Sequence, residues 1–234
     1  KNEEFDWCHT KRHAALNKNY SEALHDKASL PHVFKSKFYP DAIEKRWVTK
    51  QRKKMRIKSN HLVIVVTLSG SAVHKAYPYM DAVMAKLLMM WPNVKLVTMG
   101  DHFCKLLEAG WENEKRVYLR SGKWSIRQSL AFSQQADMVI GPETGVLNAL
   151  SMEPVPKICL LSHSSHENLT KHWINNISLE PNVDCFPCHK MHINGFKTCP
   201  RDEETGASMC AARIDPRIVI DSIIKQRVSY RKSA

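Results

Sequence analysis

The chain has 234 residues, of which 43% are hydrophobic and 25% charged, and its formal net charge is +12. This composition is typical of a folded globular protein and excludes a largely disordered chain. The best apolar stretch, residues 62–68, is far shorter than the ~20 residues that a transmembrane helix needs. The N-terminus lacks the apolar core of a signal peptide, and the seven cysteines are odd in number. Both features favour a reducing compartment, so we expect a cytoplasmic protein.

The positive charge is concentrated near the N-terminus. Between Lys45 and Lys58 the chain carries eight basic residues and no acidic one. Such a run is typical of a solvated linker or helix face. The other interpretation is peripheral contact with an anionic membrane, at its inner face, or with an anionic acceptor. Nucleic acid is disfavoured, because the run contains a single aromatic residue, Trp47, and no nucleic-acid-binding module surrounds it.

The apolar pattern changes character along the chain. Residues 1–58 form a basic helical segment with helices expected at 14–28 and 41–55, whereas residues 59–234 alternate short apolar runs with amphipathic stretches. Strands are expected at residues 62–66, 94–99, 116–119, 138–140 and 157–161. Helices are expected from residue 78, at 102–109, 125–135, 145–152 and 168–173, and from Asp215-Pro216 to the end. The sequence therefore predicts an α/β fold, a Rossmann-like parallel sheet with helices on both faces.

Parallel sheets bind ligands at the carboxyl ends of their strands, so the loops that follow strands are the candidate sites. The first such loop contains Ser69, Gly70, Ser71 and Lys75. Its glycine permits close backbone approach, its hydroxyl groups can donate to phosphate oxygens, and the lysine can neutralise a diphosphate. The alternative is a polar turn with a solvated lysine, and the motif does not decide between them.

A second loop, after the strand at 138–140, contains Glu143, Thr144 and Gly145, with Asn148 in the next helical turn. A hydroxyl and bare N–H groups at a helix N-terminus attract an anion, although Thr144 alone would suffice for an ordinary helix cap. After the second strand, Gly100 and Asp101 form a third corner. Asp101 is placed to accept from a ribose hydroxyl or, as the alternative we favour, to cap the following helix.

These motifs together resemble a known family. The order Ser-Gly-Ser…Lys-x-Tyr-Pro, then Met-Gly-Asp, then Asp-x-Val-Ile-Gly-Pro-Glu-Thr-Gly-Val-Leu-Asn-Ala-Leu is similar to the C-terminal lobe of glycosyltransferase family 9, which includes the lipopolysaccharide heptosyltransferases. The resemblance runs from about Leu62 to Ile224. The family corner usually reads Asp-Thr-Gly with a histidine in the next helix, whereas this chain has Glu143 and Asn148 at those places.

The resemblance implies the C-terminal lobe of a GT-B fold, with residues 59–234 as the nucleotide-sugar-binding domain and residues 1–58 as a basic segment or interlobe linker. It implies a donor of the ADP type, transfer of a heptose-like sugar with inversion to a saccharide or lipid-linked acceptor, and no catalytic metal. The expected donor-binding residues are Ser69, Gly70, Ser71, Lys75, Gly100, Asp101, Glu143, Thr144, Gly145 and Asn148. Lys75 would stabilise charge on the leaving diphosphate. The general base and the acceptor site are expected on a separate N-terminal lobe.

A cysteine-rich loop occupies residues 185–210. Two residues separate Cys185 from Cys188, and ten residues separate Cys188 from Cys199 and Cys199 from Cys210. Four thiols with one such knuckle match the ligands of a structural zinc site, and His189 or His192 could replace one thiol. Disulfides and free thiols are the alternatives. A non-catalytic nucleotide- or nucleic-acid-binding module with a zinc knuckle is the second functional hypothesis. Affinity for nucleoside diphosphates against oligonucleotides distinguishes it from a glycosyltransferase.

Overall fold

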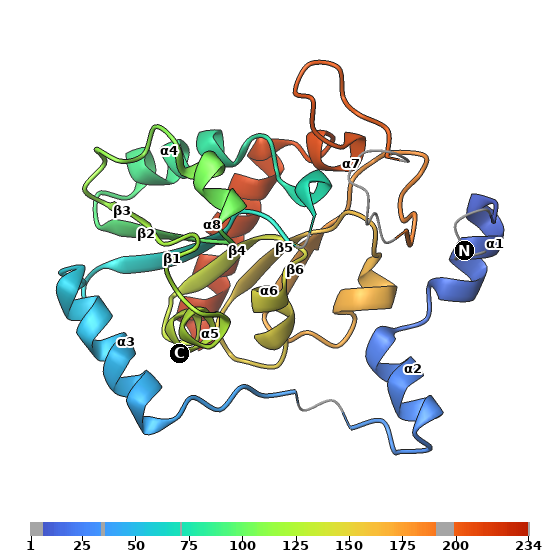
Figure 1. The fold of residues 1–234 in the computed structure, drawn as a ribbon, viewed down its shortest axis with the longest axis horizontal. Helices are drawn as coiled ribbons and strands as arrows, with labels where there is room; N and C mark the ends of the chain where they lie inside the picture. The colour runs from blue at the N-terminus through green and yellow to red at the C-terminus, as the bar shows by residue number, and fades with distance from the viewer. Residues whose placement is uncertain (1–6, 34–35, 71, 191–198, 234) are drawn as a thin grey trace.

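The computed structural model describes residues 7–33, 36–70, 72–190 and 199–233. At its centre lies one parallel sheet with strand order β3-β2-β1-β4-β5-β6 (Figure 1). The strands are β1 (Leu62–Thr67), β2 (Val94–Met99), β3 (Val117–Leu119), β4 (Met138–Pro142), β5 (Lys157–Leu160) and β6 (Asn176–Leu179). The predicted α/β class with a Rossmann-like parallel sheet is confirmed. The strand order reverses between β1 and β4, and that point is where such sheets open a crevice for ligands.

Helices cover both faces of the sheet, because β1 is apolar from Leu62 to Val66. Its odd and even residues enter two separate cores: Leu62, Ile64 and Val66 in one, Val63 and Val65 in the other. The first core packs against α4 (Met80–Met90) and α8 (Pro216–Ser233), and the second against α3 (Ala42–Lys54), α5 (Ile126–Ser133) and α6 (Gly145–Ala149). A strand buried on both faces reads as a continuous apolar run, which is the pattern seen in the sequence.

Local capping fixes where several helices begin. Asp41 and Glu44 form a reciprocal capping box at the start of α3, and Ser125 and Gln128 form another at the start of α5. The helix α8 begins at Pro216, as the sequence predicts, and the Asp215 carboxylate accepts from the Arg217 N–H at 2.8 Å. Caps of this kind satisfy backbone donors that have no partner inside the helix.

Four elements differ from the sequence prediction. The sixth strand, β6, was not expected, because its side chains are half-exposed and it lies at the sheet edge. The helix expected at 14–28 is broken into α1 (His9–Leu16) and α2 (Tyr20–Lys27), because the Asn19 side chain caps a new helix by accepting from Ser21 N and Glu22 N. The helices expected at 102–109 and 168–173 are a 3₁₀ helix, η3 (Phe103–Glu108), and a π-helical turn, η4 (His166–Thr170). The remaining short elements are η2 (Val73–Lys75) and α7 (Met209–Ala212).

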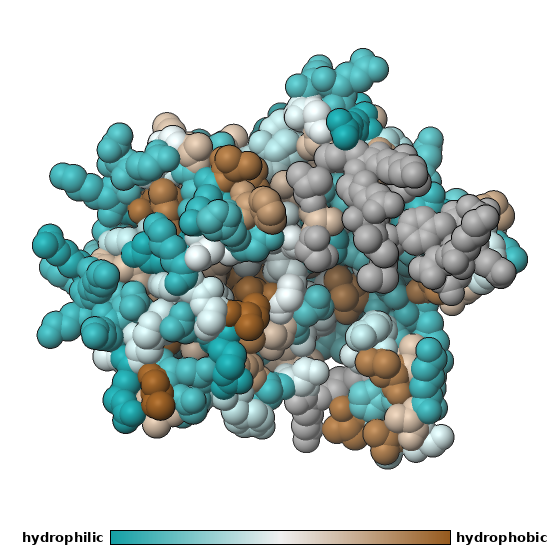
Figure 2. Space-filling view, viewed as in Figure 1, coloured by the Kyte–Doolittle hydropathy of each residue, from teal (hydrophilic) through white to brown (hydrophobic). Residues whose placement is uncertain are grey.

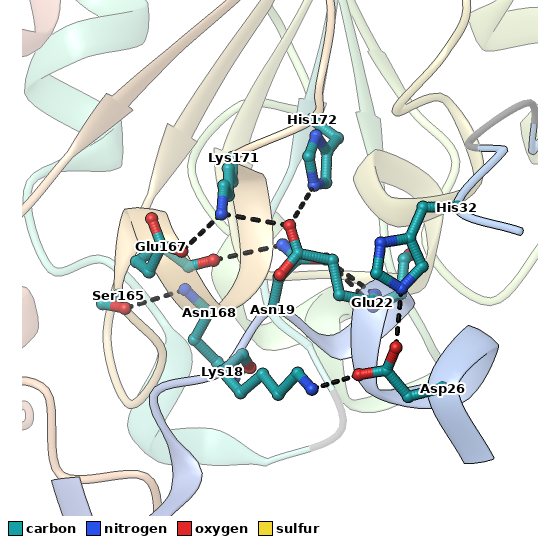
Figure 3. Close-up of polar contacts among 11 residues, drawn as sticks. Lys18, Asn19, Glu22, Asp26, His32, Ser165, Glu167, Asn168, Lys171 and His172 are labelled. Atoms are coloured by element: carbon teal, nitrogen blue, oxygen red, sulfur yellow. Dashed lines mark hydrogen bonds and ion pairs between the residues drawn. The ribbon is translucent and has the colours of Figure 1, made fainter. Parts of the chain in front are cut away.

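The N-terminal helices α1 and α2 lie beside η4, far from them in sequence, and polar contacts hold them there (Figure 3). The Asn19 amide donates to the Glu167 carbonyl at 3.1 Å. Glu22 Oε1 lies 3.0 Å from Lys171 Nζ and 2.8 Å from His172 Nε2. Because the side chains of Glu22, Lys171 and His172 are partly exposed, each of these ion pairs contributes little alone, and several contacts together hold the N-terminal helices in place. An extended segment then connects α2 to α3 on the opposite side of the molecule (Figure 1).

Within the described residues, none of the helices is long and apolar enough to span a bilayer.

Candidate functional site

A cleft opens at the carboxyl edge of the sheet, where the loops after β1, β2 and β4 meet. Its volume is about 370 Å³. The residues that line it are Thr67, Ser69, Gly70, Met99, Gly100, Asp101, Trp124, Ile126, Ser129, Thr144, Gly145 and Val146. A neighbouring hollow of about 320 Å³ shares Ser69, Gly70 and Asp101 and is completed by apolar side chains of η3. The cleft therefore combines three loop corners that the sequence marked separately.

Two glycines allow the loops after β1 and β4 to approach this closely. A Cβ atom on Gly70 would lie 2.7 Å from the Glu143 carbonyl oxygen, and one on Gly141 would lie 2.1 Å from Thr67 Oγ1. Gly141 also has a φ of +151°, which side-chain-bearing residues rarely adopt. Neither position can accept a side chain without moving the opposite strand end. Close backbone contact between β1 and β4 is thus built into the sequence by glycine.

Glu143 joins the loops after β1, β4 and β5 through one buried carboxylate. Its Oε1 accepts from the backbone N–H groups of Ser162 at 2.6 Å and Ser164 at 3.2 Å. Its Oε2 lies 2.6 Å from His163 Nδ1 and 3.8 Å from Lys75 Nζ. The Glu143 side chain is only 2% exposed, so each of these partners matters more than it would in water.

The surroundings of Glu143 keep it ionised. Burial on its own raises the pKa of this carboxyl, but His163, Lys75 and the Ser162 N–H outweigh burial, and the pKa lies below its ordinary value of 4.5. At neutral pH the site therefore contains a buried anion between two basic side chains. Lys75 lies beside the cleft: its side chain is 12% exposed, and a Cβ atom on Gly70, which lines the cleft, would lie 2.9 Å from Lys75 Cδ.

Six of the ten predicted donor-binding residues line the cleft: Ser69, Gly70, Gly100, Asp101, Thr144 and Gly145. Lys75 and Glu143 lie beside it as an ion pair. Asn148 is exposed on α6 and is not among the lining residues. Ser71 lies outside the described residues.

The capping alternatives considered for two of these residues are also present. The Thr144 hydroxyl accepts from Leu147 N at 3.3 Å, and the Asp101 carboxylate accepts from Cys104 N at 3.1 Å. A cap uses one side-chain oxygen as an acceptor. A carboxylate or a hydroxyl has more than one site for a hydrogen bond, so capping does not exclude contact with a ligand in the cleft.

Sequence reasoning missed the wall contributed by Trp124, Ile126 and Ser129. The Trp124 ring packs edge-on against Trp47 of α3, with centroids 5.0 Å apart, and also contacts Phe132. An aromatic residue directly before a capping serine, at the end of a loop that follows a strand, was the available signal. Trp124 gives the cleft a rigid apolar surface beside the polar loop corners.

The four cysteines of the 185–210 segment line one cavity of about 100 Å³. His9, Arg12, His74, Ser162 and His163 also line it, so the cavity adjoins the ion pair at Glu143. The N-terminal helix α1 closes the cavity from outside, because His9 Nε2 lies 3.0 Å from the Pro187 carbonyl and the Arg12 guanidinium donates to the Cys188 carbonyl at 2.6 Å.

Cys185, Cys199 and Cys210 carry free thiols. Burial raises the pKa of Cys188 to about 11 and that of Cys199 to about 12, so these two thiols are protonated at neutral pH. The donor set suits zinc in kind and number. However, among residues 7–33, 36–70, 72–190 and 199–233 no three metal-binding side chains are grouped closely enough to hold an ion. The four cysteines line one cavity, and zinc coordination stays a prediction.

Comparison with known proteins gives a consistent answer at the level of the fold. No protein-family model matches the sequence, and no curated protein matches it. Among solved structures, the ADP-heptose LPS heptosyltransferase II of E. coli has a TM-score of 0.63 at 13% identity. A glycosyltransferase family 9 protein of Veillonella parvula has a TM-score of 0.66 at 13% identity. The dodecameric iron-containing heptosyltransferase TibC, in complex with ADP-D-β-D-heptose, has a TM-score of 0.54 at 15% identity.

The resemblance to family 9 glycosyltransferases is therefore confirmed as a similarity of fold. The match covers 88% of this chain against the first two structures and 75% against TibC. This chain spans 57%, 58% and 48% of those proteins, respectively. At these identities the likeness establishes a glycosyltransferase-like architecture. Whether this chain shares the activity of those proteins is taken up as a proposal below.

Proposed function

We propose that the cleft binds a nucleoside diphosphate sugar and that the chain is the donor-binding part of a glycosyltransferase. The observation that carries the proposal is the meeting of the Ser69–Gly70 and Thr144–Gly145 corners in one cleft, with Lys75 beside it in an ion pair with Glu143. Backbone N–H groups and a nearby ammonium group suit a diphosphate. The solved structures that share the fold include one in complex with ADP-D-β-D-heptose, which supports an ADP-type donor.

The lining residues suggest an orientation for the donor. The diphosphate would lie against the loops after β1 and β4, within reach of Lys75. The Asp101 carboxylate would accept from a ribose hydroxyl, and the base would lie against the Trp124 side chain. Large aromatic side chains bind bases through their faces and edges at low entropic cost. The sugar would then face the mouth of the cleft, where an acceptor can approach.

The chemistry that follows is an inverting transfer of a heptose-like sugar. An acceptor hydroxyl of a saccharide or lipid-linked glycan attacks the anomeric carbon, and a base removes its proton. The bond between that carbon and the diphosphate oxygen breaks, and the diphosphate leaves with the electron pair. Lys75 would stabilise the charge that develops on it. We propose that the base and the acceptor site belong to a second lobe, because the chain spans just over half of the related structures.

A structural zinc ion at Cys185, Cys188, Cys199 and Cys210 is a separate part of the proposal. Its support is the convergence of four thiols on one small cavity. Zinc would deprotonate the thiols and tie the cysteine-rich segment to the edge of the sheet. Metal analysis of protein purified without chelator, together with a count of reactive thiols, tests it. One zinc per chain and four protected thiols support the site, and four reactive thiols without bound metal contradict it.

Calorimetric titration tests the donor proposal. ADP, UDP and GDP are titrated into the wild-type protein and into two variants, Lys75→Ala and Lys86→Ala. Lys86 is an exposed lysine of α4 and serves as the matched control. Loss of a charged contact should weaken diphosphate binding by about 1.5–3 kcal/mol in Lys75→Ala, with no change in Lys86→Ala. Preference for a single-stranded oligonucleotide over every nucleotide would favour the non-catalytic nucleic-acid module instead.

A further inference from the structure

The outward side of α3 presents basic side chains on one continuous face. Arg46, Lys50 and Lys53 recur at intervals of four and three residues, which places them on the same side of the helix. Val48 and the C-cap residue Met55, which anchor α3 to the domain, are 0% and 2% exposed. All three basic residues are exposed, as are Lys45 and Lys54 beside them. We call Lys45, Arg46, Lys50, Lys53 and Lys54 the basic face.

The charge of the basic face is not balanced by neighbouring acids. Glu44 is the single acidic residue within α3, and Arg127 of α5 occupies it through contacts of 2.5 and 2.8 Å. In the described part of the chain, none of the carboxylates forms an ion pair with a residue of the basic face. A solvated helix that is stabilised by surface ion pairs carries both signs of charge, whereas the basic face carries one sign. That face is arranged to attract an anionic surface.

Two exposed apolar side chains accompany these cations. Ile43 is 69% exposed and precedes Arg46 by three residues, so it continues the same side of the helix. Tyr39, just before α3, is 74% exposed, and Lys37 Nζ lies 5.7 Å from its ring centroid. Figure 2 shows hydrophilic side chains projecting from the side of the molecule that carries α3, with an isolated apolar patch near its lower end.

We propose that this face docks the protein onto a bilayer that contains anionic lipid. Cations of the basic face would lie at the headgroup phosphates, and Ile43 and Tyr39 would enter the boundary with the acyl chains. The exposed isoleucine distinguishes a membrane from a nucleic acid, because an aliphatic side chain gains from burial in lipid but offers no surface for base stacking. Trp47, the aromatic residue within α3, already packs against Trp124.

Docking in this way has a consequence for the cleft. Trp47 extends from the inner side of α3 to Trp124, which lines the cleft. A helix with its side chains is about 10–12 Å across. The cleft wall would therefore lie about one helix diameter from the membrane, within reach of a lipid-linked molecule. The docking inference does not depend on nucleotide binding, because the basic face and the cleft residues are different sets.

Vesicle sedimentation tests the proposal. Wild-type protein is mixed with vesicles of pure phosphatidylcholine and with vesicles containing 30% phosphatidylglycerol. A triple variant, Arg46→Gln, Lys50→Gln and Lys53→Gln, is compared with a control triple variant, Lys27→Gln, Lys86→Gln and Lys225→Gln, which removes exposed lysines from α2, α4 and α8. Each basic residue near an anionic membrane contributes about fivefold in affinity. The first variant should bind the anionic vesicles roughly a hundredfold more weakly than the control.

The apolar contact is tested separately. Ile43→Ser should reduce affinity for the anionic vesicles by about tenfold while leaving binding to soluble heparin unchanged. Equal binding of the wild type to both vesicle types overturns the proposal, as does equal weakening by the two triple variants. Tighter binding to a single-stranded oligonucleotide than to the anionic vesicles would assign the face to nucleic acid instead. Calorimetry with ADP on the first triple variant should match wild type, so failure of docking and failure of the donor proposal are distinguishable.

Discussion

Glu143 Oε2 and His163 Nδ1 lie 2.6 Å apart, although the two residues follow different strands of the sheet. The same carboxylate also lies 3.8 Å from Lys75 Nζ, which follows a third strand. One buried anion thus holds the ends of β1, β4 and β5 together at the edge where the cleft opens. This relationship makes Glu143 the residue whose replacement should disturb the whole site.

Removal of the Glu143 carboxylate should be costly. Replacing it with alanine leaves Lys75 and His163 without their buried partner and two backbone N–H groups without an acceptor. Loss of one member of a buried ion pair typically costs about 3–5 kcal/mol of unfolding free energy. Glu143→Gln should cost less, since its amide oxygen can still accept from Ser162 N. Urea denaturation of the three proteins measures the difference, and equal stability of Glu143→Ala and wild type would contradict the structural role.

The same carboxylate predicts an acid dependence of stability. Its pKa in the folded protein is below the ordinary value of 4.5, so the unfolded chain binds a proton more readily. The stabilisation is present above pH 4.5 and is lost as the pH falls through the folded-state pKa. The wild type should therefore lose stability below about pH 4.5 more steeply than Glu143→Gln. Denaturation midpoints measured between neutral pH and pH 3 would show parallel curves if Glu143 played no part.

Two glycines of the cleft should respond differently to the same change. A Cβ on Gly70 would lie 2.7 Å from the Glu143 carbonyl oxygen, whereas one on Gly145 would meet nothing within 4 Å. Gly70→Ala should lower the unfolding free energy by about 1–3 kcal/mol, as overpacking does. Gly145→Ala should be neutral or raise it by up to about 1 kcal/mol. Thermal melts compare them directly. Similar effects of the two substitutions would mean that the loops are not packed as described.

Lys157 predicts how the stability of the protein changes at alkaline pH. Its side chain is fully buried and donates to the carbonyls of Glu153 at 2.9 Å and Val155 at 2.8 Å. Burial lowers its pKa to about 8, and Glu153 offsets part of that effect. Between about pH 8 and the ordinary value of 10.5, the unfolded state binds more protons, so stability due to this group rises with pH. Relative to Lys157→Met, the wild type should gain on the order of 3 kcal/mol across that window. An unchanged difference between the two proteins would exclude a lowered pKa.

Trp124 should determine how strongly a nucleotide base is held. Trp124→Ala should weaken ADP binding by about 1–3 kcal/mol, the usual loss when a base loses its aromatic partner. Trp124→Phe keeps an aromatic ring and should retain most of the affinity. Calorimetry measures both variants, with a melting curve for each because Trp124 also packs against Trp47 and Phe132. If a folded Trp124→Ala protein bound ADP as tightly as the wild type, the proposed contact between the base and Trp124 would be contradicted.

Local sequence patterns predicted much of the fold, because strand burial and helix starts depend on residues that are close together in the sequence. The apolar run of β1, the basic helix predicted at residues 41–55 and the Asp215-Pro216 start of α8 each depend on residues that are close together in the sequence. β6 escaped prediction since its Asn176–Leu179 segment is half-exposed and paired on one side alone. The break between α1 and α2 was missed because Asn19 both caps α2 and donates to Glu167, a residue 148 positions away.

The site was predictable only in part for the same reason. Five site residues could be predicted because each follows a predicted strand, and residues after parallel strands lie at the same edge of the sheet. They are Ser69, Gly70, Lys75, Thr144 and Gly145. The pairing of Glu143 with His163 depends on a register between β4 and β5 that no short motif encodes. Trp124 likewise enters the cleft because α3 supports it from behind, a contact across 77 positions of sequence.

Hydrogen–deuterium exchange with and without ADP tests the central claim most directly, because it shows where a nucleotide binds and not merely whether it does. The cleft predicts slower exchange at the loops around residues 68–76, 99–104, 123–129 and 143–147, with little change at the cysteine-rich segment or along α8. Protection confined to those loops would support a donor site at the carboxyl ends of β1, β2 and β4. Protection elsewhere, or none at saturating ADP, would contradict it.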